Sequence, residues 1–168
     1  GPAYAGTGVF KSVNGGRTWD NMGLPDSHHI GKIVIHPKNA DVVYVAAMGH
    51  FWTPNQERGV FRTMDGGRTW TRVLFISDRT GVIDLAMDPS DPKTLYAAAW
   101  QLTSGPESGL YRTTDGGATW KKLSNGLPAG PLGRAGIDIA PSNPRVIYTF
   151  LDNWTPSAPP NKDRPIVG

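Results

Sequence analysis

The sequence predicts an all-β fold built from repeated four-stranded antiparallel sheets, and three observations lead to that fold class. Two marker motifs recur with nearly the same period. Their shared residues are tryptophans spaced by 51 and 50 residues and tyrosines spaced by 52 residues, namely Trp19, Trp70, Trp120, Tyr44, Tyr96 and Tyr148. Gly and Pro are frequent, with 21 and 15 residues, as in a chain with many tight turns. No segment sustains the 3.6-residue apolar period of an amphipathic helix.

Each repeat reads as four short strands. The first strand is apolar and stops at a proline, which cannot donate to a sheet ladder. The second is rich in β-branched and aromatic residues, and the third and fourth flank a Gly-Gly turn that closes a hairpin. We expect first strands over residues 33–35, 82–87 and 137–139, each followed by a turn rich in Asn, Asp, Ser and Pro.

A period of about 50 residues with four strands per unit is the size of one β-propeller blade. We expect about three blades in total: two complete ones over residues 30–74 and 82–123, and two partial ones over residues 1–24 and 132–154. Residues 155–168 are rich in proline and are expected to form a loop or linker. Closed propellers need about four to eight blades. The segment is therefore expected to belong to a larger propeller, completed by further blades of the same chain or by another copy.

The turn between the third and fourth strands carries a specific motif, Ser/Thr-x-Asp-x-Gly-x-Thr-Trp. It occurs three times, with Asn in the Asp position of the first copy, and its residues are Ser12, Asn14, Gly16, Thr18, Trp19, Thr63, Asp65, Gly67, Thr69, Trp70, Thr113, Asp115, Gly117, Thr119 and Trp120. This pattern resembles the Asp box of the BNR-repeat β-propellers, and the run of blades is most similar to their sortilin-like and xyloglucanase-like branch. The resemblance covers the chain up to about Asn153. It implies the propeller fold, and the motif is specific for that fold and not for any one function.

Elementary chemistry assigns the Asp box a structural role. The Asp side chain can accept hydrogen bonds from the amides of its own turn, and the glycines can adopt positive φ. The Ser or Thr hydroxyl can join this network, and the Trp is expected to close over the sheet and bury about 150–250 Å². Asn14 can make much the same bonds as an Asp. We therefore expect these residues to build hairpins and not to catalyse a reaction.

Candidate binding residues lie in the connections at the other end of the blades. The Asp boxes mark one end, the bottom face, so the connections that enter and leave each blade must gather at the opposite top face. Aromatic side chains with polar neighbours suit sugar rings or peptides, and binding residues concentrate on such loops. The candidate ligand-binding residues are His28, His29, His50, Trp52, Asp78, Arg79, Trp100, Arg134 and Trp154.

Catalysis on this face would need two carboxyl groups at the spacing used by glycosidases. Asp26, Asp78 and Asp152 are the candidates, and Glu57 and Glu107 lie in the longer connections, but nothing local singles out a pair. The sequence shows no phosphate loop, dinucleotide fingerprint or zinc-protease motif, and we expect no cofactor. Three histidines are candidates for the top face, but no metal-ligand spacing is evident, so we expect no metal site either.

Composition narrows the functional classes further. The formal charge is +3 and the 17 Lys and Arg residues are spread along the chain, which argues against nucleic-acid binding. No apolar stretch is long enough to span a membrane. We expect a secreted, periplasmic or cell-surface propeller segment that recognises a protein, peptide or carbohydrate through its top face. The alternatives are part of a glycoside hydrolase acting on polysaccharide, and a structural subunit of a larger assembly.

Overall fold

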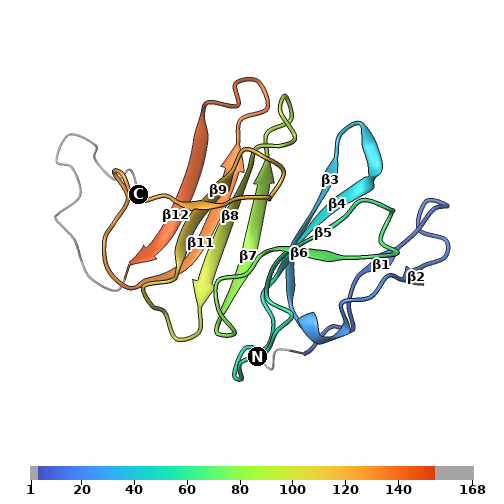
Figure 1. Ribbon diagram of the computed structural model, residues 1–168, viewed down its shortest axis with the longest axis horizontal. Helices are drawn as coiled ribbons and strands as arrows, with labels where there is room; N and C mark the ends of the chain where they lie inside the picture. The colour runs from blue at the N-terminus through green and yellow to red at the C-terminus, as the bar shows by residue number, and fades with distance from the viewer. Residues whose placement is uncertain (1–3, 154–168) are drawn as a thin grey trace, which may run out of the picture.

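The computed structural model describes residues 4–153, and within them the chain folds into antiparallel sheets arranged side by side (Figure 1). Two sheets have four strands: β3 (Ile30–His36), β4 (Asn39–Ala47), β5 (Gly59–Thr63) and β6 (Thr71–Leu74), then β7 (Thr80–Met87), β8 (Leu95–Gln101), β9 (Gly109–Thr113) and β10 (Lys121–Lys122). Two sheets have two strands: β1 (Phe10–Lys11) with β2 (Asp20–Asn21), and β11 (Leu132–Ile139) with β12 (Ile147–Asn153). The predicted all-β propeller segment, with two complete and two partial blades, is confirmed.

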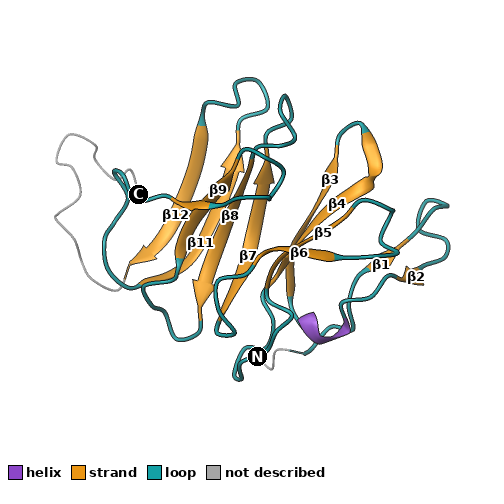
Figure 2. Ribbon diagram, viewed as in Figure 1, coloured by secondary structure: helices purple, strands orange, loops and turns teal. Residues whose placement is uncertain are grey.

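One short helix interrupts this pattern, the 3-10 helix η1 (Pro25–Ser27), drawn purple in Figure 2. It lies in the connection between β2 and β3. No other helix occurs in residues 4–153, so this part of the chain has none long and apolar enough to cross a bilayer. The exact domain limits remain predictions, and the proposed linker over residues 155–168 lies outside the described residues.

Neighbouring sheets pack face to face through separate apolar clusters. The cluster between the two four-stranded sheets is formed by Tyr44, Ala46, Val60, Leu74, Val82, Leu85, Leu95, Ala97 and Ala99. A second cluster joins the β7–β10 sheet to β11 and β12, and a third joins the β3–β6 sheet to the residues around β1 and β2. Small alanines in the central strand β8 let the flanking sheets approach closely, because they fill little of the gap between sheets.

Strand β7 comes into close backbone contact with the preceding blade near the top face. A Cβ atom on Gly31 of β3 would lie 2.0 Å from the Ile83 carbonyl oxygen of β7. A Cβ on Gly81 of β7 would lie 2.2 Å from the carbonyl oxygen of Met48. Only glycine fits at either position.

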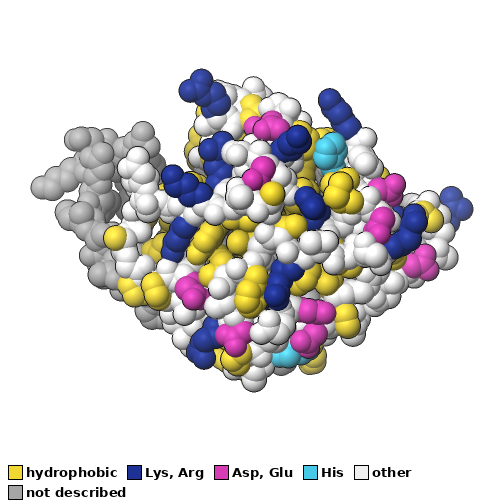
Figure 3. Space-filling model, viewed as in Figure 1, with side chains coloured by type: hydrophobic (Ala, Val, Ile, Leu, Met, Phe, Trp, Pro, Cys, Tyr) yellow, Lys and Arg dark blue, Asp and Glu magenta, His cyan; other side chains and the backbone are white. Residues whose placement is uncertain are grey.

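Apolar surface is spread across the face shown in Figure 3, with Lys and Arg side chains scattered among acidic and apolar ones.

The Asp boxes form the β5–β6 and β9–β10 turns, and the hydrogen-bond network of the second box shows how. The Thr63 hydroxyl donates to Asp65 Oδ1 at 2.8 Å and accepts from the Gly67 amide at 2.8 Å. The Thr69 amide and hydroxyl both donate to the Asp65 carboxylate, at 2.9 and 2.6 Å. These bonds hold the pKa of Asp65 far below its ordinary value, with the Thr69 hydroxyl as the largest cause. The third box repeats the same bonds around Asp115.

The first box uses an amide in place of the carboxylate. Asn14 Oδ1 accepts from the Thr18 amide at 3.0 Å, while Asn14 Nδ2 donates to the Thr18 hydroxyl at 2.8 Å. Trp19 differs from the expectation of a buried ring, since it is 60% exposed and its Nε1 donates to Gly16 of its own turn. The difference has a simple cause: no sheet precedes β1 within the described residues, so the Trp19 ring has none to pack on.

The second and third boxes also bind the preceding blade, which the sequence did not indicate. Trp70 Nε1 donates to the Met22 carbonyl at 2.7 Å, and Lys11 Nζ donates to the Gly66 carbonyl at 3.0 Å. In the next blade, the Gly116 carbonyl accepts from the Tyr44 hydroxyl and from Arg62 Nη1, both at 2.9 Å. Each of these boxes therefore closes its own hairpin and also ties two blades together.

Candidate functional site

The connections at the top face contact one another, although they come from different blades. The boxes lie at the opposite end beside the first turns of the blades, where the Gly66 amide donates to the Asp41 carbonyl at 2.9 Å. At the top, the Asp26 amide donates to Glu57 Oε2 at 2.7 Å and the Asn55 amide donates to the Asp78 carbonyl at 3.1 Å. The two ends of the blades therefore have separate chemistry, as the strand alternation predicts.

A cavity of about 350 Å³ opens at this face between residues of three blades. His29 precedes β3, Met48 and Phe51 follow β4, Trp100 is in β8 and Arg134 is in β11. The remaining lining residues are Ile30, Gly31 and Ile83. Arg134 lies within the register shift between Leu132 and Ala135 of β11. This irregularity in the strand therefore coincides with the residue that lines the cavity.

Aromatic rings form a continuous series along the cavity wall. The His29 and Phe51 ring centroids are 3.8 Å apart, and the Phe51 and Trp100 centroids are 6.2 Å apart with their planes at 59°. The Arg134 guanidinium carbon lies 4.8 Å from the centroid of the Trp100 ring, within the range of a cation–π contact. The wall thus combines apolar ring surface with a fixed positive charge.

Two polar atoms of the cavity residues are buried without a hydrogen-bond partner in residues 4–153: His29 Nε2 and Trp100 Nε1. His29 Nδ1 lies 2.9 Å from the Gly49 carbonyl oxygen, so Nδ1 carries the proton and, in the neutral ring, Nε2 is left as an acceptor. Trp100 Nε1 can only donate. Leaving such groups unpaired is costly, so the residues around the cavity hold an acceptor, a donor and a cation without strong protein partners.

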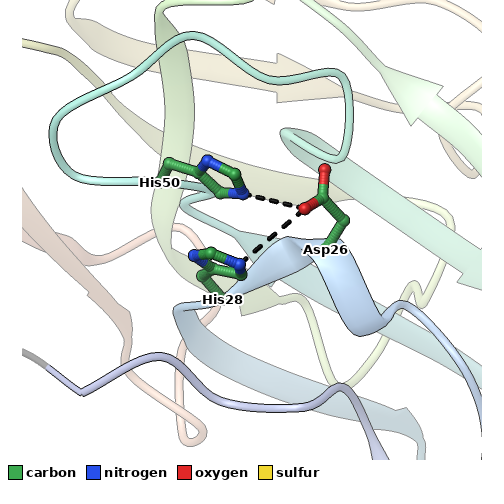
Figure 4. Close-up of side chains that lie close together, drawn as sticks. All are labelled: Asp26, His28 and His50. Carbon is green, nitrogen blue, oxygen red and sulfur yellow. Dashed lines mark hydrogen bonds and ion pairs between the residues drawn. The ribbon is translucent and has the colours of Figure 1, made fainter.

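A second group of polar side chains lies on the same face. His50 Nε2 is 2.8 Å and His28 Nε2 is 3.7 Å from the same oxygen, Asp26 Oδ1 (Figure 4). The two imidazole rings stack with centroids 3.7 Å apart and planes at 17°. The hydrogen bond from His50 is the largest cause that lowers the pKa of Asp26, and Asn55 lowers it further. Asp26 is therefore suited to remain a carboxylate and to act as an acceptor.

Arg58 fixes the connection that carries His50 and Phe51, and the sequence did not single it out. Its side chain is fully buried and donates to the Met48 carbonyl at 2.6 Å, to the Thr53 carbonyl at 2.9 Å and to the His50 carbonyl. Burial lowers the pKa of Arg58. Comparison of the repeats could have identified Arg58. The corresponding position before the third strand of the next blade is Ser108, so an arginine at this position departs from the repeat.

The remaining candidate residues do not join the cavity. Trp52 is 88% exposed, and its neighbour Phe51 lines the cavity in its place. Asp78 and Arg79 are exposed, and they contribute backbone carbonyls that accept from Asn55 and from Leu102. Asp152 is exposed in β12, and Trp154 lies outside the described residues. The three catalytic candidates thus come from separate elements: η1, the β6–β7 connection and β12.

Comparison with known families identifies the family of the chain. The family model described as sortilin, neurotensin receptor 3, matches residues 7–130, which is more than half of the chain. The chain belongs to the Sortilin-Vps10 family. No curated protein matches it significantly.

Solved structures similar to this Sortilin-Vps10 segment are propeller enzymes. An ancestral GH74 enzyme aligns with a TM-score of 0.67 at 18% identity, over 88% of this chain and 19% of its own. The GH74 enzyme of Niastella koreensis aligns with a TM-score of 0.61 at 25% identity, over 83% and 21%. The GH74 xyloglucanase of Xanthomonas campestris aligns with a TM-score of 0.61 at 17% identity, over 84% and 23%. The chain therefore spans about a fifth of the length of these enzymes.

Proposed function

We propose that this chain is part of an extracytoplasmic propeller that recognises a protein, peptide or glycan through its top face. The observation that carries the proposal is the cavity between Phe51, Trp100 and Arg134, where side chains from three blades meet. Most small-ligand sites are concave and apolar with a few convergent polar groups. This cavity has that composition.

The wall chemistry favours a ligand that has both ring or apolar surface and hydrogen-bonding groups. The Trp100 and Phe51 rings can stack on a sugar ring or hold an apolar side chain. Arg134 is exposed and can donate to hydroxyl, carbonyl or carboxylate oxygens, whereas His29 Nε2 and Trp100 Nε1 are buried and would reach a ligand only after their rings move. Sugars and peptides both present such groups.

Membership of the Sortilin-Vps10 family supports a receptor-like role and, with it, a secreted, periplasmic or cell-surface location. Fractionation of cells that express the full-length protein tests the location directly. Recovery in the cytosolic fraction alone would contradict it. We also propose that further strands of the same chain, or of another copy, pair with the open edges of β1 and β12 and complete these two blades.

A glycoside hydrolase is the second candidate, and the similar GH74 structures favour it. Glycosidases pair a carboxylate with a carboxylic acid that has a raised pKa. The lowered pKa of Asp26 suits the base or nucleophile and not the acid. Under this alternative the acid comes from another part of the propeller. A structural role in an assembly is the third candidate, favoured by the exposed Tyr148 and Phe150 side chains of β12.

Binding of the full-length protein to arrays of glycans and of peptides separates these functions. We expect Trp100→Ala and Arg134→Ala to weaken binding of the array ligand by at least about tenfold, because each removes a wall contact worth about 1–2 kcal/mol. Trp52→Ala and Arg145→Ala are the matched controls, since both side chains are exposed and neither lines the cavity. Equal losses in the controls would refute the cavity as the binding site.

The hydrolase alternative has its own readout. Release of reducing ends from xyloglucan by the full-length protein, abolished in Asp26→Asn with the fold intact, would replace recognition by hydrolysis. Binding without cleavage supports recognition. Absence of both, together with co-purification of a defined complex, would favour the assembly role.

A further inference from the structure

Asp26, His28 and His50 place one carboxylate oxygen and two imidazole nitrogens within 4.8 Å of one another (Figure 4). We propose that these three side chains bind a divalent transition-metal ion, of which Zn²⁺ fits the donor set best. The inference goes beyond ligand recognition by the cavity and does not depend on it. Two imidazoles and one carboxylate are ligands that zinc accepts, and three protein ligands leave a position open for water or an oxygen of a ligand.

The three ligand atoms already lie close to one another. Nε2 of His50 and Nε2 of His28 lie 2.8 and 3.7 Å from Asp26 Oδ1. Zinc binds nitrogen and oxygen at about 2.0–2.2 Å in a tetrahedral arrangement, so two of its ligands are separated by about 3.3 Å. The two separations from Asp26 Oδ1 bracket that value, and all three ligand atoms lie within 4.8 Å of one another, so a small shift of the ligands is needed to reach a common ion. Asp26 and the two histidines are also partly exposed, so an ion can reach them from solvent.

A set of outer contacts holds two of the three ligands in place, as is usual around metal sites. Asn55 Nδ2 donates to the Asp26 carbonyl at 2.8 Å and lies 3.4 Å from Asp26 Oδ2, which leaves Oδ1 directed to the histidines. Asn55 Oδ1 accepts from the His50 amide at 3.1 Å. Asn55 is itself buried. One buried amide therefore sets the relative position of the carboxylate and of His50.

The second nitrogen of His50 has a partner that suits the metal-bound ring. His50 Nδ1 lies 2.9 Å from the Thr53 hydroxyl oxygen. In the ion-free site the Asp26 carboxylate only accepts, so Nε2 carries the proton and Nδ1 of the neutral ring accepts from Thr53. When zinc takes the place of the Nε2 proton, Nδ1 carries a proton and donates to the same hydroxyl. Thr53 supports both tautomers because a hydroxyl can donate or accept.

The backbone around His28 is strained in the way that functional turns often are. His28 has φ 51° and Leu24 has φ 58°, and these two residues bracket η1. Residues other than glycine seldom adopt positive φ, and where they do the strain tends to accompany a site. Here the strained turn brings the His28 ring onto His50.

His28 is the ligand that has to move. The lone pair of an imidazole nitrogen lies in the ring plane, and the His28 and His50 planes are nearly parallel. A common ion must lie close to both planes, so binding requires the stack to open by rotation of one ring. His50 is held by Thr53 and Asn55, whereas the described contacts of the His28 ring are to Asp26, His50 and His29. We expect His28 to rotate.

Titration of the full-length, chelator-treated protein with ZnCl₂ in a calorimeter tests the proposal. We expect saturable uptake of one ion per chain. Asp26→Asn, His28→Gln and His50→Gln should each weaken this step by at least about 100-fold, and Thr53→Val by about tenfold, because loss of an outer contact costs about 10–100-fold in metal affinity. His36→Gln is the matched control, since His36 lies at the end of β3 toward the bottom face, and we expect it to bind as the parent protein does.

Two further measurements decide between a true site and loss of folding. Circular dichroism shows whether each variant keeps the sheet signal, and we expect His28→Gln to keep it because the described contacts of the His28 ring are to Asp26, His50 and His29 alone. Zinc X-ray absorption of the loaded protein should show two imidazole ligands. Absence of saturable uptake by the parent protein, uptake unchanged in folded His28→Gln and His50→Gln, or a spectrum without imidazole would each overturn the proposal.

Discussion

The bottom and top faces of the blades follow opposite rules. At the bottom, the second and third Asp boxes repeat the same bonds with the same residue types, and both tie their blade to the one before. At the top, the connections differ in length and composition, and they bring histidines, an arginine and aromatic rings together from three blades. At the bottom, the carboxylates and hydroxyls of these two boxes are paired within the fold, whereas Trp120 Nε1 and Arg62 Nε are buried without a partner among the described residues. At the top, His29 Nε2 and Trp100 Nε1 are not paired with any described residue. The bottom face therefore carries the hairpin structure that the repeats share. The top face carries the residues that differ between repeats and form the candidate site.

The largest effect should come from the side chain that supports the top face. We expect Arg58→Met to lower the free energy of unfolding by about 4 kcal/mol, because it leaves the carbonyls of Met48, His50 and Thr53 buried without their donor. Urea denaturation of the full-length protein measures the change. Arg68→Met, an exposed position in the second box, is the control and should change stability by less than about 0.5 kcal/mol. Equal effects would show that Arg58 contributes no special support.

The stability lost on removing the Trp of an Asp box should depend on whether that Trp contacts a preceding blade. Trp70→Ala should cost about 3 kcal/mol, because the half-buried ring packs on the third apolar cluster and donates to the preceding blade. Trp19→Ala removes a ring that is 60% exposed and should cost less than about 1 kcal/mol. Similar losses at the two positions, again from denaturant curves, would contradict the view that the box Trp acts mainly between blades.

Acid should weaken the carboxylate boxes and spare the amide box. The pKa of Asp65 and of Asp115 is lowered from 3.8 in the folded protein by hydrogen bonds, mainly from Thr69 and Thr119. A lowered folded-state pKa gives stability that is present above the unfolded pKa and is lost as pH falls below about 4. Asp65→Asn should therefore flatten the fall of melting temperature with acid. A variant as acid-sensitive as the parent protein would argue against this linkage.

The smallest effect is expected at an exposed top-face carboxylate. Asp78→Asn should leave the free energy of unfolding within about 0.5 kcal/mol of the parent value, because the side chain is exposed and only its carbonyl bonds another connection. The same urea curves report it. A larger loss would mean that the top face relies on this charge for stability, against the division between the two faces.

Periodicity was sufficient to predict the blades, since the repeat fixes strand order and therefore which turns share an end. It could not show that Trp70 bonds the neighbouring blade, because contacts between repeats depend on how the sheets pack. The choice between Phe51 and Trp52 also lay beyond the sequence: both are aromatic, and the path of one connection decides which ring faces inward. The Asp26, His28 and His50 cluster depends on two positive-φ residues that composition does not reveal.

The backbone contacts at Gly31 and Gly81 have a consequence for selectivity. The two carbonyls that exclude a side chain there belong to Ile83 and Met48, and both of these residues line the cavity. Neighbouring sheets cannot slide closer together without a collision, nor can a larger residue wedge them apart without disrupting the wall. The width of the cavity is therefore fixed by the backbone. We expect it to select ligands by their thickness before any hydrogen bond to the wall contributes.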